Sequence, residues 1–178
     1  MSVSITKSQL QKIIQEAVKK QLSSKPSTTK KKTLKEHSLS ESEIQEIYDQ
    51  LVVTMLWSSI FFGDDENDER NGEPLDRYFS SSDLNTETVG KLHNLIYAFV
   101  GAVERATGKS IVEVSQDCGK DLSDLGHDLW LTAAEHGAGF WDGDWDMHEK
   151  ALVRAAKTMF GSHTPYVGDD GSIYLTRG

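Results

Sequence analysis

Apolar residues recur every three or four positions along two long segments of the chain, which is the spacing of one helix face. The first segment predicts a helix over about 41–61, and the second predicts a helix over about 86–107. Ser40 and Glu43 have the spacing of a capping box at the start of the first helix. Gly108 directly follows the second helix, where a glycine commonly serves as the C-cap.

Two further helices begin at capping-box patterns. The first pattern starts at Ser110 and predicts a helix toward about residue 125, which Gly126 is expected to end. The second pattern starts at Asp146 and predicts a helix to about residue 160.

The C-terminal half also contains patterns typical of strands. Residues 127–132 and 137–142 alternate and are rich in aromatic side chains, which predicts one hairpin. Residues 166–168 and 172–175 flank the turn sequence 169–171, which predicts a second hairpin. The expected fold class is α+β, with a mainly helical N-terminal part and a small antiparallel sheet of two hairpins in the C-terminal half.

The chain is expected to consist of three parts. Residues 1–22 predict an amphipathic basic helix that begins at the capping box of Thr6, and residues 23–38 predict a flexible linker rich in Lys, Ser and Thr. Residues 39–178 are expected to form an acidic, compact α+β domain. These 140 or so residues suffice for one domain with a hydrophobic core.

Charge is distributed unevenly along the chain. Residues 1–36 hold nine Lys and two Glu, a net +7, and residues 37–178 hold ten Lys or Arg and 26 Asp or Glu, a net −16, which together give −9. An acidic body repels the phosphates of duplex nucleic acid, so we do not expect it to bind them. Its charge instead suits a basic protein partner, a cation or solubility alone. With one cysteine, Cys118, and no long apolar run, we expect a cytoplasmic protein without a membrane span.

Three short motifs of the C-terminal part resemble a small family of uncharacterised bacteriophage and prophage proteins. The motifs are Gly126-His127-Asp128-Leu129-Trp130-Leu131-Thr132, His136-Gly137-Ala138-Gly139-Phe140-Trp141-Asp142 and Tyr166-Val167-Gly168-Asp169-Asp170-Gly171. The chain departs from the family at 133–135, where an Arg-Asn pair is expected. The resemblance implies a location in the cytoplasm of an infected bacterium, or in association with the virion, and carries no established activity.

Ligand-type side chains are densest after residue 126. His127, Asp128, His136 and Asp142 are candidate metal ligands, because His and carboxylate side chains bind zinc, manganese or iron. Paired strands would bring His127 and Asp142 together. No established metal-binding spacing is present, so capping of the neighbouring elements is the alternative role for these residues.

Aromatic residues gather in the same region. The candidate binding residues are Trp130, His136, Trp141, Asp142, Tyr166, Asp169 and Asp170. An aromatic side chain on a glycine-lined strand can stack on a base or a sugar, because glycine lets a ligand approach the backbone. The alternative is that these aromatic side chains form the core.

Three classes of function remain open. The first is an accessory protein of phage type that binds a host or phage protein, and it requires no catalytic motif and no cofactor. The second is a binder of a small ligand or nucleotide at the aromatic hairpin. The third is a metal-dependent hydrolase that uses His127, Asp128, His136 and Asp142. The first fits the acidic body best.

Overall fold

A computed structural model describes residues 39–161 and 163–176. The predicted helix at 1–22 and the predicted linker at 23–38 lie outside the described residues. The chain divides into two units, and the fold below is that of the unit at 37–178. None of the helices in the described residues combines the length and apolar content that a membrane crossing requires.

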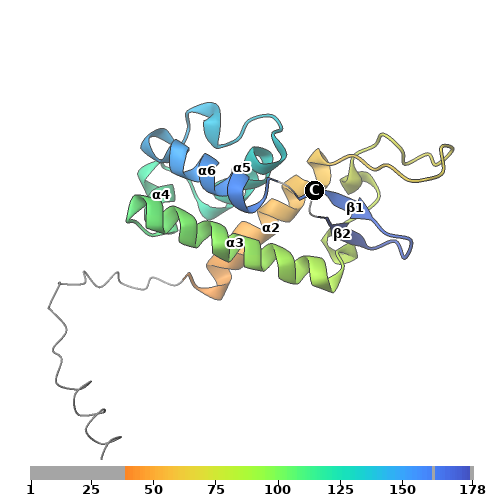
Figure 1. The fold of residues 1–178 in the computed structure, drawn as a ribbon, viewed down its shortest axis with the longest axis horizontal. Coiled ribbons are helices and arrows are strands. Elements are labelled where there is room, and N and C mark those ends of the chain that lie inside the picture. The colour runs from red at the N-terminus through yellow and green to blue at the C-terminus, as the bar shows by residue number, and fades with distance from the viewer. Residues whose placement is uncertain (1–38, 162, 177–178) are drawn as a thin grey trace, which may run out of the picture. The chain divides into compact units, whose positions relative to one another are not determined.

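Five helices and one hairpin make up the described part of the chain (Figure 1). The helices are α2 (Glu41–Ser58), α3 (Thr86–Thr107), α4 (Ile111–Asp117), α5 (Leu122–Ala134) and α6 (Glu149–Met159). Strands β1 (Pro165–Val167) and β2 (Ile173–Leu175) pair antiparallel, with Tyr166 opposite Tyr174. This mostly helical fold with a small antiparallel sheet confirms the predicted α+β class.

The ends of α2 and α3 lie close to where the sequence predicts them. The Ser40 side chain accepts a hydrogen bond from the backbone amide of Glu43, and the Glu43 side chain accepts one from the backbone amide of Ser40. α3 ends at Gly108, whose φ of 72° is the left-handed conformation that a glycine C-cap adopts. Asn85, which the sequence pattern did not single out, caps the start of α3.

The predicted strand at 127–132 is wrong, because these residues belong to α5. The predicted helix from 111 toward 125 is also interrupted: α4 ends at Asp117, Gly119 turns with a φ of 66°, and α5 begins at a capping box of Asp121 and Asp124. Gly126 therefore lies inside a helix and does not end one.

The predicted strand at 137–142 is also wrong. Its last residues, Phe140–Asp142, form a short 3-10 helix, so the sheet consists of one hairpin and the predicted aromatic hairpin is absent. Asp146 starts another 3-10 turn, and α6 follows it without a side-chain cap, which contradicts the predicted capping box.

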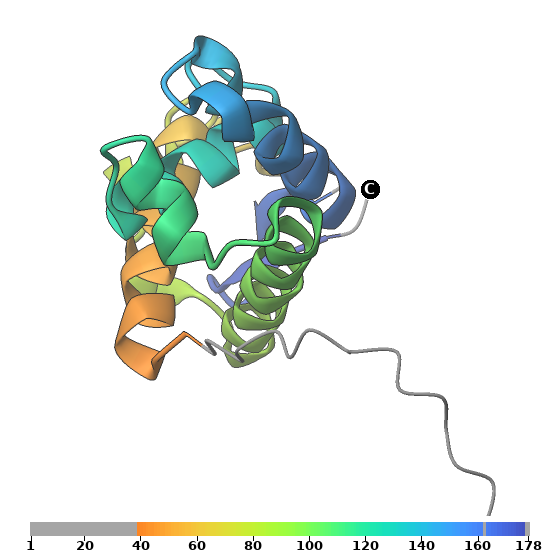
Figure 2. The same ribbon diagram turned by 90° about the vertical axis from the view of Figure 1, so that its left-hand side faces the viewer.

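The crossing of α2 and α5 forms the centre of the domain. A Cβ atom at Gly126 would lie 2.4 Å from the carbonyl oxygen of Ile47, so only a glycine lets the two backbones approach this closely. α3 and α6 pack on another side of the core, as Figure 2 shows. There the buried rings of Phe99 and Phe140 stack at 6.0 Å, and Trp145 meets Phe140 edge-on.

The hairpin is fastened to the chain segment that precedes α3. Leu84 forms a parallel bridge with Ile173, and the Asn85 amide donates to the Ile173 carbonyl at 2.9 Å. Lys91 Nζ donates to the carbonyl oxygen of Leu175 at 2.9 Å. These bonds attach β2 to Leu84, Asn85 and the first turns of α3.

Candidate functional site

Trp130, a predicted binding residue, lies in α5 and is only 2 % exposed. Its indole N–H donates to the Ser58 hydroxyl at 3.0 Å, and the Ser58 hydroxyl donates in turn to the Thr54 carbonyl at 2.6 Å. The Ser58 proton is therefore committed to the backbone of α2. Ser58 positions the Trp130 ring and does not present a nucleophile.

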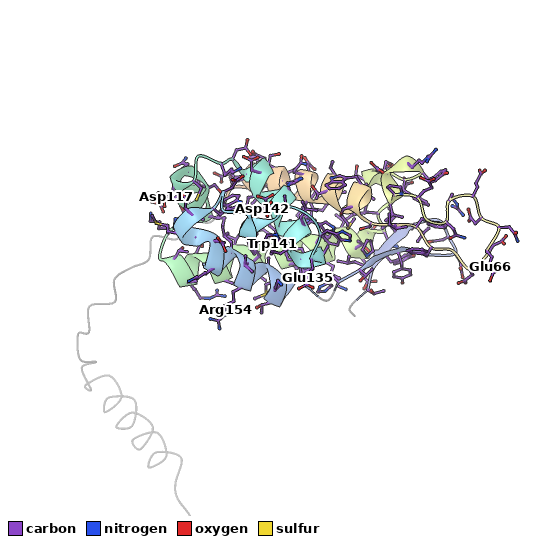
Figure 3. All side chains as sticks on the ribbon, turned by 90° about the horizontal axis from the view of Figure 1, so that it is seen from above. Glu66, Asp117, Glu135, Trp141, Asp142 and Arg154 are labelled. Atoms are coloured by element: carbon purple, nitrogen blue, oxygen red, sulfur yellow. The ribbon has the colours of Figure 1, made fainter. Side chains whose placement is uncertain are left out.

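Trp141 and Asp142 lie in the 3-10 helix after α5 (Figure 3). Trp141 is half-buried, donates its indole N–H to the Gly137 carbonyl at 3.2 Å, and has Lys157 Nζ 5.7 Å from its ring centre. Asp142 is exposed. Neither residue lines the cleft where α2, α5 and β1 meet.

The predicted metal ligands do not form a metal site. Asp128 Oδ1 accepts from His127 Nδ1 at 2.8 Å, and Asp128 Oδ2 accepts from the indole N–H of buried Trp145 at 2.7 Å. Across residues 39–161 and 163–176, no three His, Cys, Asp or Glu side chains come together to hold an ion. Asp128 instead anchors the buried Trp145 ring through Oδ2, and its Oδ1 is engaged by His127.

A second polar cluster joins α4 to the start of α6. The buried His148 ring lies with its Nε2 2.8 Å from Asp117 Oδ2, and Lys109 also pairs with Asp117. The hydrogen bonds from Lys109 and His148 lower the pKa of the Asp117 carboxyl. Cys118 follows directly, and partial burial raises the pKa of its thiol. This cluster fastens two helices together.

A cleft of about 540 Å³ opens where α2, α5 and β1 meet. Its lining comes from three parts of the chain together with Leu75: residues 58–62, Trp130 with residues 133–136, and Gly161 with residues 163–167. Trp130, His136 and Tyr166 are the predicted binding residues that this cleft brings together. Trp130 lies at its buried wall, whereas Tyr166 is 47 % exposed at its rim.

Comparison of the chain with protein-family models, curated proteins and solved structures finds no match. The resemblance to phage and prophage proteins therefore stays a prediction.

The rim of the cleft carries large exposed apolar side chains. Phe62 is 81 % exposed and Ile60 is 41 % exposed, beside Tyr166 from the hairpin. Sequence reasoning missed Ile60 and Phe62 because it placed residue 60 at the end of a longer helix. The signal was the run of three apolar residues at 60–62 directly before an acidic loop, only one of which, Phe61, is buried.

The acidic loop beside the rim has a defined structure. Phe61 exchanges backbone hydrogen bonds with Gly72 and Glu73, and the Gly63 amide donates to Asn71 Oδ1 at 2.6 Å. Arg70 lies over the Phe61 ring, 4.6 Å from its centre. Hydrogen bonds from Arg70 also lower the pKa of the Asp68 carboxyl to about 2.

The other predicted binding residues lie in the hairpin turn. Asp170 accepts hydrogen bonds from the Ser172 amide at 3.0 Å and the Tyr174 hydroxyl at 2.9 Å, and these bonds lower the pKa of its carboxyl. Asp169 is exposed at the same turn. Neither Asp169 nor Asp170 lines the cleft, but both follow the rim residue Tyr166 within four positions of the chain.

Proposed function

We propose that this chain is a non-catalytic accessory protein that binds another protein through the cleft between α2, α5 and β1. The observation that carries the proposal is the group of exposed apolar side chains, Ile60, Phe62 and Tyr166, around a wall formed by Trp130. Contiguous exposed apolar surface marks interaction sites in soluble proteins. Aromatic anchors in a pocket contribute most of the binding energy at such interfaces.

The resemblance of the C-terminal motifs to phage and prophage proteins supports a partner from the phage or its bacterial host. The net charge of −16 at residues 37–178 supports a protein partner over duplex DNA. We place the protein in the cytoplasm of an infected bacterium or in association with the virion.

The test compares two exposed side chains of equal exposure. Phe62 lies at the rim, and Met147 lies in the 3-10 turn directly before α6. Each is 81 % exposed, so replacing either with Ser leaves the core intact. Full-length protein, Phe62→Ser and Met147→Ser are each used to capture proteins from bacterial lysate, with quantification by mass spectrometry. A partner of the cleft is retained by Met147→Ser and reduced at least about tenfold by Phe62→Ser.

A result in which every captured protein binds the two variants equally contradicts the proposal. Circular dichroism of both variants, which we expect to match that of the unmodified protein, excludes unfolding as the reason for a loss.

A small apolar ligand is the second candidate occupant, because about 540 Å³ falls within the usual range of ligand pockets. Its predicted basis, an aromatic side chain on a glycine-lined strand, is absent from the structure. Native mass spectrometry of the purified protein tests this candidate. A retained ligand adds a discrete mass to the protein, and Phe62→Ser should lower the fraction of molecules that carry this added mass.

A further inference from the structure

Two acidic turns stand beside the cleft at one end of the described domain. The loop at 63–73 continues directly from the rim residue Phe62, and Figure 3 shows Glu66 at its far tip. The hairpin turn at 168–171 continues from the strand of Tyr166 and projects from the same end of the domain in Figure 1. Carboxylates therefore flank the apolar rim on two sides.

Cations within the domain neutralise few of these carboxylates. Residues 63–74 hold six Asp or Glu and one Arg, a net charge of −5. Asp68 is paired with Arg70, and Glu73 is paired with Arg77. The exposed residues Asp64, Glu66 and Glu69 have no ion pair to a cation among the residues that the structure describes.

The loop holds these charges in place. Its base is closed by the backbone bonds of Phe61, and Asn71 spans it by accepting from the Gly63 amide and donating to the Asp65 carbonyl at 2.7 Å. Arg70 fixes the loop to the Phe61 ring. A partner that meets fixed charges loses less conformational entropy than one that must order a flexible loop.

We propose that the occupant of the cleft is a basic segment of the partner protein. A large apolar side chain of this segment packs between Phe62, Tyr166 and Trp130, and neighbouring Lys or Arg side chains face the acidic loop. The apolar anchor supplies most of the affinity, and the charges supply selectivity and faster association. This inference rests on the proposed function and specifies the chemistry of its partner.

The charge pattern disfavours two other occupants. A second copy of the domain at 37–178 would bring a net charge of −16 toward the acidic turns, and like charges placed together at an interface repel. An acidic segment would meet the same repulsion. A basic segment instead gains attraction from both turns.

The experiment selects peptides from a random displayed library with the full-length protein as bait. Peptides that also bind full-length Phe62→Ser are removed, so the survivors depend on the cleft. We expect survivors to carry one large apolar residue with at least two Lys or Arg within a few positions of it. The best survivor is then synthesised, and its dissociation constant is measured by fluorescence anisotropy.

Two triple variants give a matched comparison. Asp64→Asn with Glu66→Gln and Glu69→Gln neutralises the loop, and we expect it to weaken binding about tenfold, since each exposed ion pair contributes a fraction of that change. The control variant is Glu41→Gln with Glu46→Gln and Asp142→Asn, which removes three exposed charges from other elements. We expect the control to change binding less than about twofold, because none of its three residues lines the cleft or belongs to the two acidic turns.

The outcomes separate this inference from the proposed function. Survivors that need Phe62 but lack basic residues, or that bind both triple variants equally, overturn the basic segment and leave a protein-binding cleft. A concentration-dependent dimer that Phe62→Ser abolishes overturns it too, because a second copy then fills the cleft. If no survivor depends on Phe62, the proposed function fails as well.

Discussion

At the scale of single residues, Gly126 and Gly90 are both glycines inside helices, yet their surroundings differ. A Cβ atom at Gly126 would collide with the backbone of α2, whereas a Cβ atom at Gly90 would meet no atom within 4 Å. A glycine in a helix is costly unless a neighbour requires it. The close crossing of α2 and α5 therefore explains Gly126, and nothing in the structure requires Gly90.

We expect Gly126→Ala to lower the free energy of unfolding by about 1–3 kcal/mol, the usual cost of forcing extra volume into a packed core. The control Gly90→Ala should raise it by about 0.5–1 kcal/mol, because alanine favours the helix. Chemical denaturation of both variants measures the difference. Equal effects would show that α2 and α5 can separate without cost.

Trp130 and Trp141 allow a second comparison at this scale. We expect Trp130→Ala to cost about 3–5 kcal/mol, because Trp130 is buried and anchored to Ser58. Trp141→Ala should cost markedly less, because Trp141 is half-buried in a short turn. Thermal and urea unfolding measure both costs. A Trp141→Ala variant that unfolds as readily would place Trp141 in the core.

The lowered pKa of Asp68 predicts how the stability of the fold depends on pH. Hydrogen bonds from Arg70 lower its pKa to about 2, below the value of about 3.9 expected in the unfolded chain. The ionised contact therefore stabilises the fold above about pH 4, and this contribution is lost as the pH falls from about 4 to 2. Arg70→Ala should raise the pKa of Asp68 in an NMR titration, while Arg77→Ala should leave it unchanged.

At the scale of elements, α5 departs most from what its sequence indicates. Leu122, Leu125, Gly126, Leu129 and Ala133 recur with helical spacing on one buried face, but Leu131, on the opposite side, is buried as well and blurs this stripe near the C-terminal end. The alternation at 127–132 then imitates a strand. What reveals the helix is its start, where the Asp121 side chain accepts a hydrogen bond from the Asp124 amide at 2.8 Å.

Asp121→Ala should lower the free energy of unfolding by about 1 kcal/mol, because it removes the N-cap of α5. Asp121→Asn should cost little, since Asn caps a helix as well as Asp does. Denaturant melts of the two variants test this expectation. If both substitutions cost the same, the charge of Asp121 and not its cap stabilises α5.

The sequence predicts several local caps and one turn correctly, although the capping box predicted at Asp146 is wrong, and it predicts distant contacts poorly. The caps at Ser40 and Gly108 are encoded within a few residues, and so is the hairpin turn at 169–171, so they are confirmed. The role of Gly126 depends on Ile47, almost 80 residues earlier, which no local pattern records. The cleft likewise joins distant segments, so the sequence indicated Trp130, His136 and Tyr166 without the neighbouring Phe62.

At the scale of the whole domain, the C-terminal hairpin packs against a segment that lies far earlier in the chain. Ile173 is fully buried and pairs with Leu84, which lies 89 positions earlier in the chain. β1 supplies one wall of the cleft, so the cleft exists only when the hairpin is docked. Under the proposed function, the contacts of Ile173 therefore couple the stability of the domain to binding at the cleft.

We expect Ile173→Ala to cost about 2–5 kcal/mol and Ile173→Val about 0.5–1.5 kcal/mol, because both shorten a buried side chain to different extents. The loss should lower the unfolding midpoint of the helices, followed by circular dichroism, and not only that of the hairpin. Unfolding of the hairpin with the helices unchanged would show that the two are independent.

Cys118 has a practical consequence for following the cleft in solution. It is the single cysteine of the chain, and burial together with Asp146 and Asp117 raises the pKa of its thiol, so little of the reactive thiolate exists near neutral pH. A cysteine introduced as Asn67→Cys in the acidic loop would be exposed and would react with a maleimide dye first, while Phe62 and the carboxylates of the loop stay in place. The native chain thus gives a low labelling background for one fluorophore in the loop beside the cleft, whose emission would report binding of a partner.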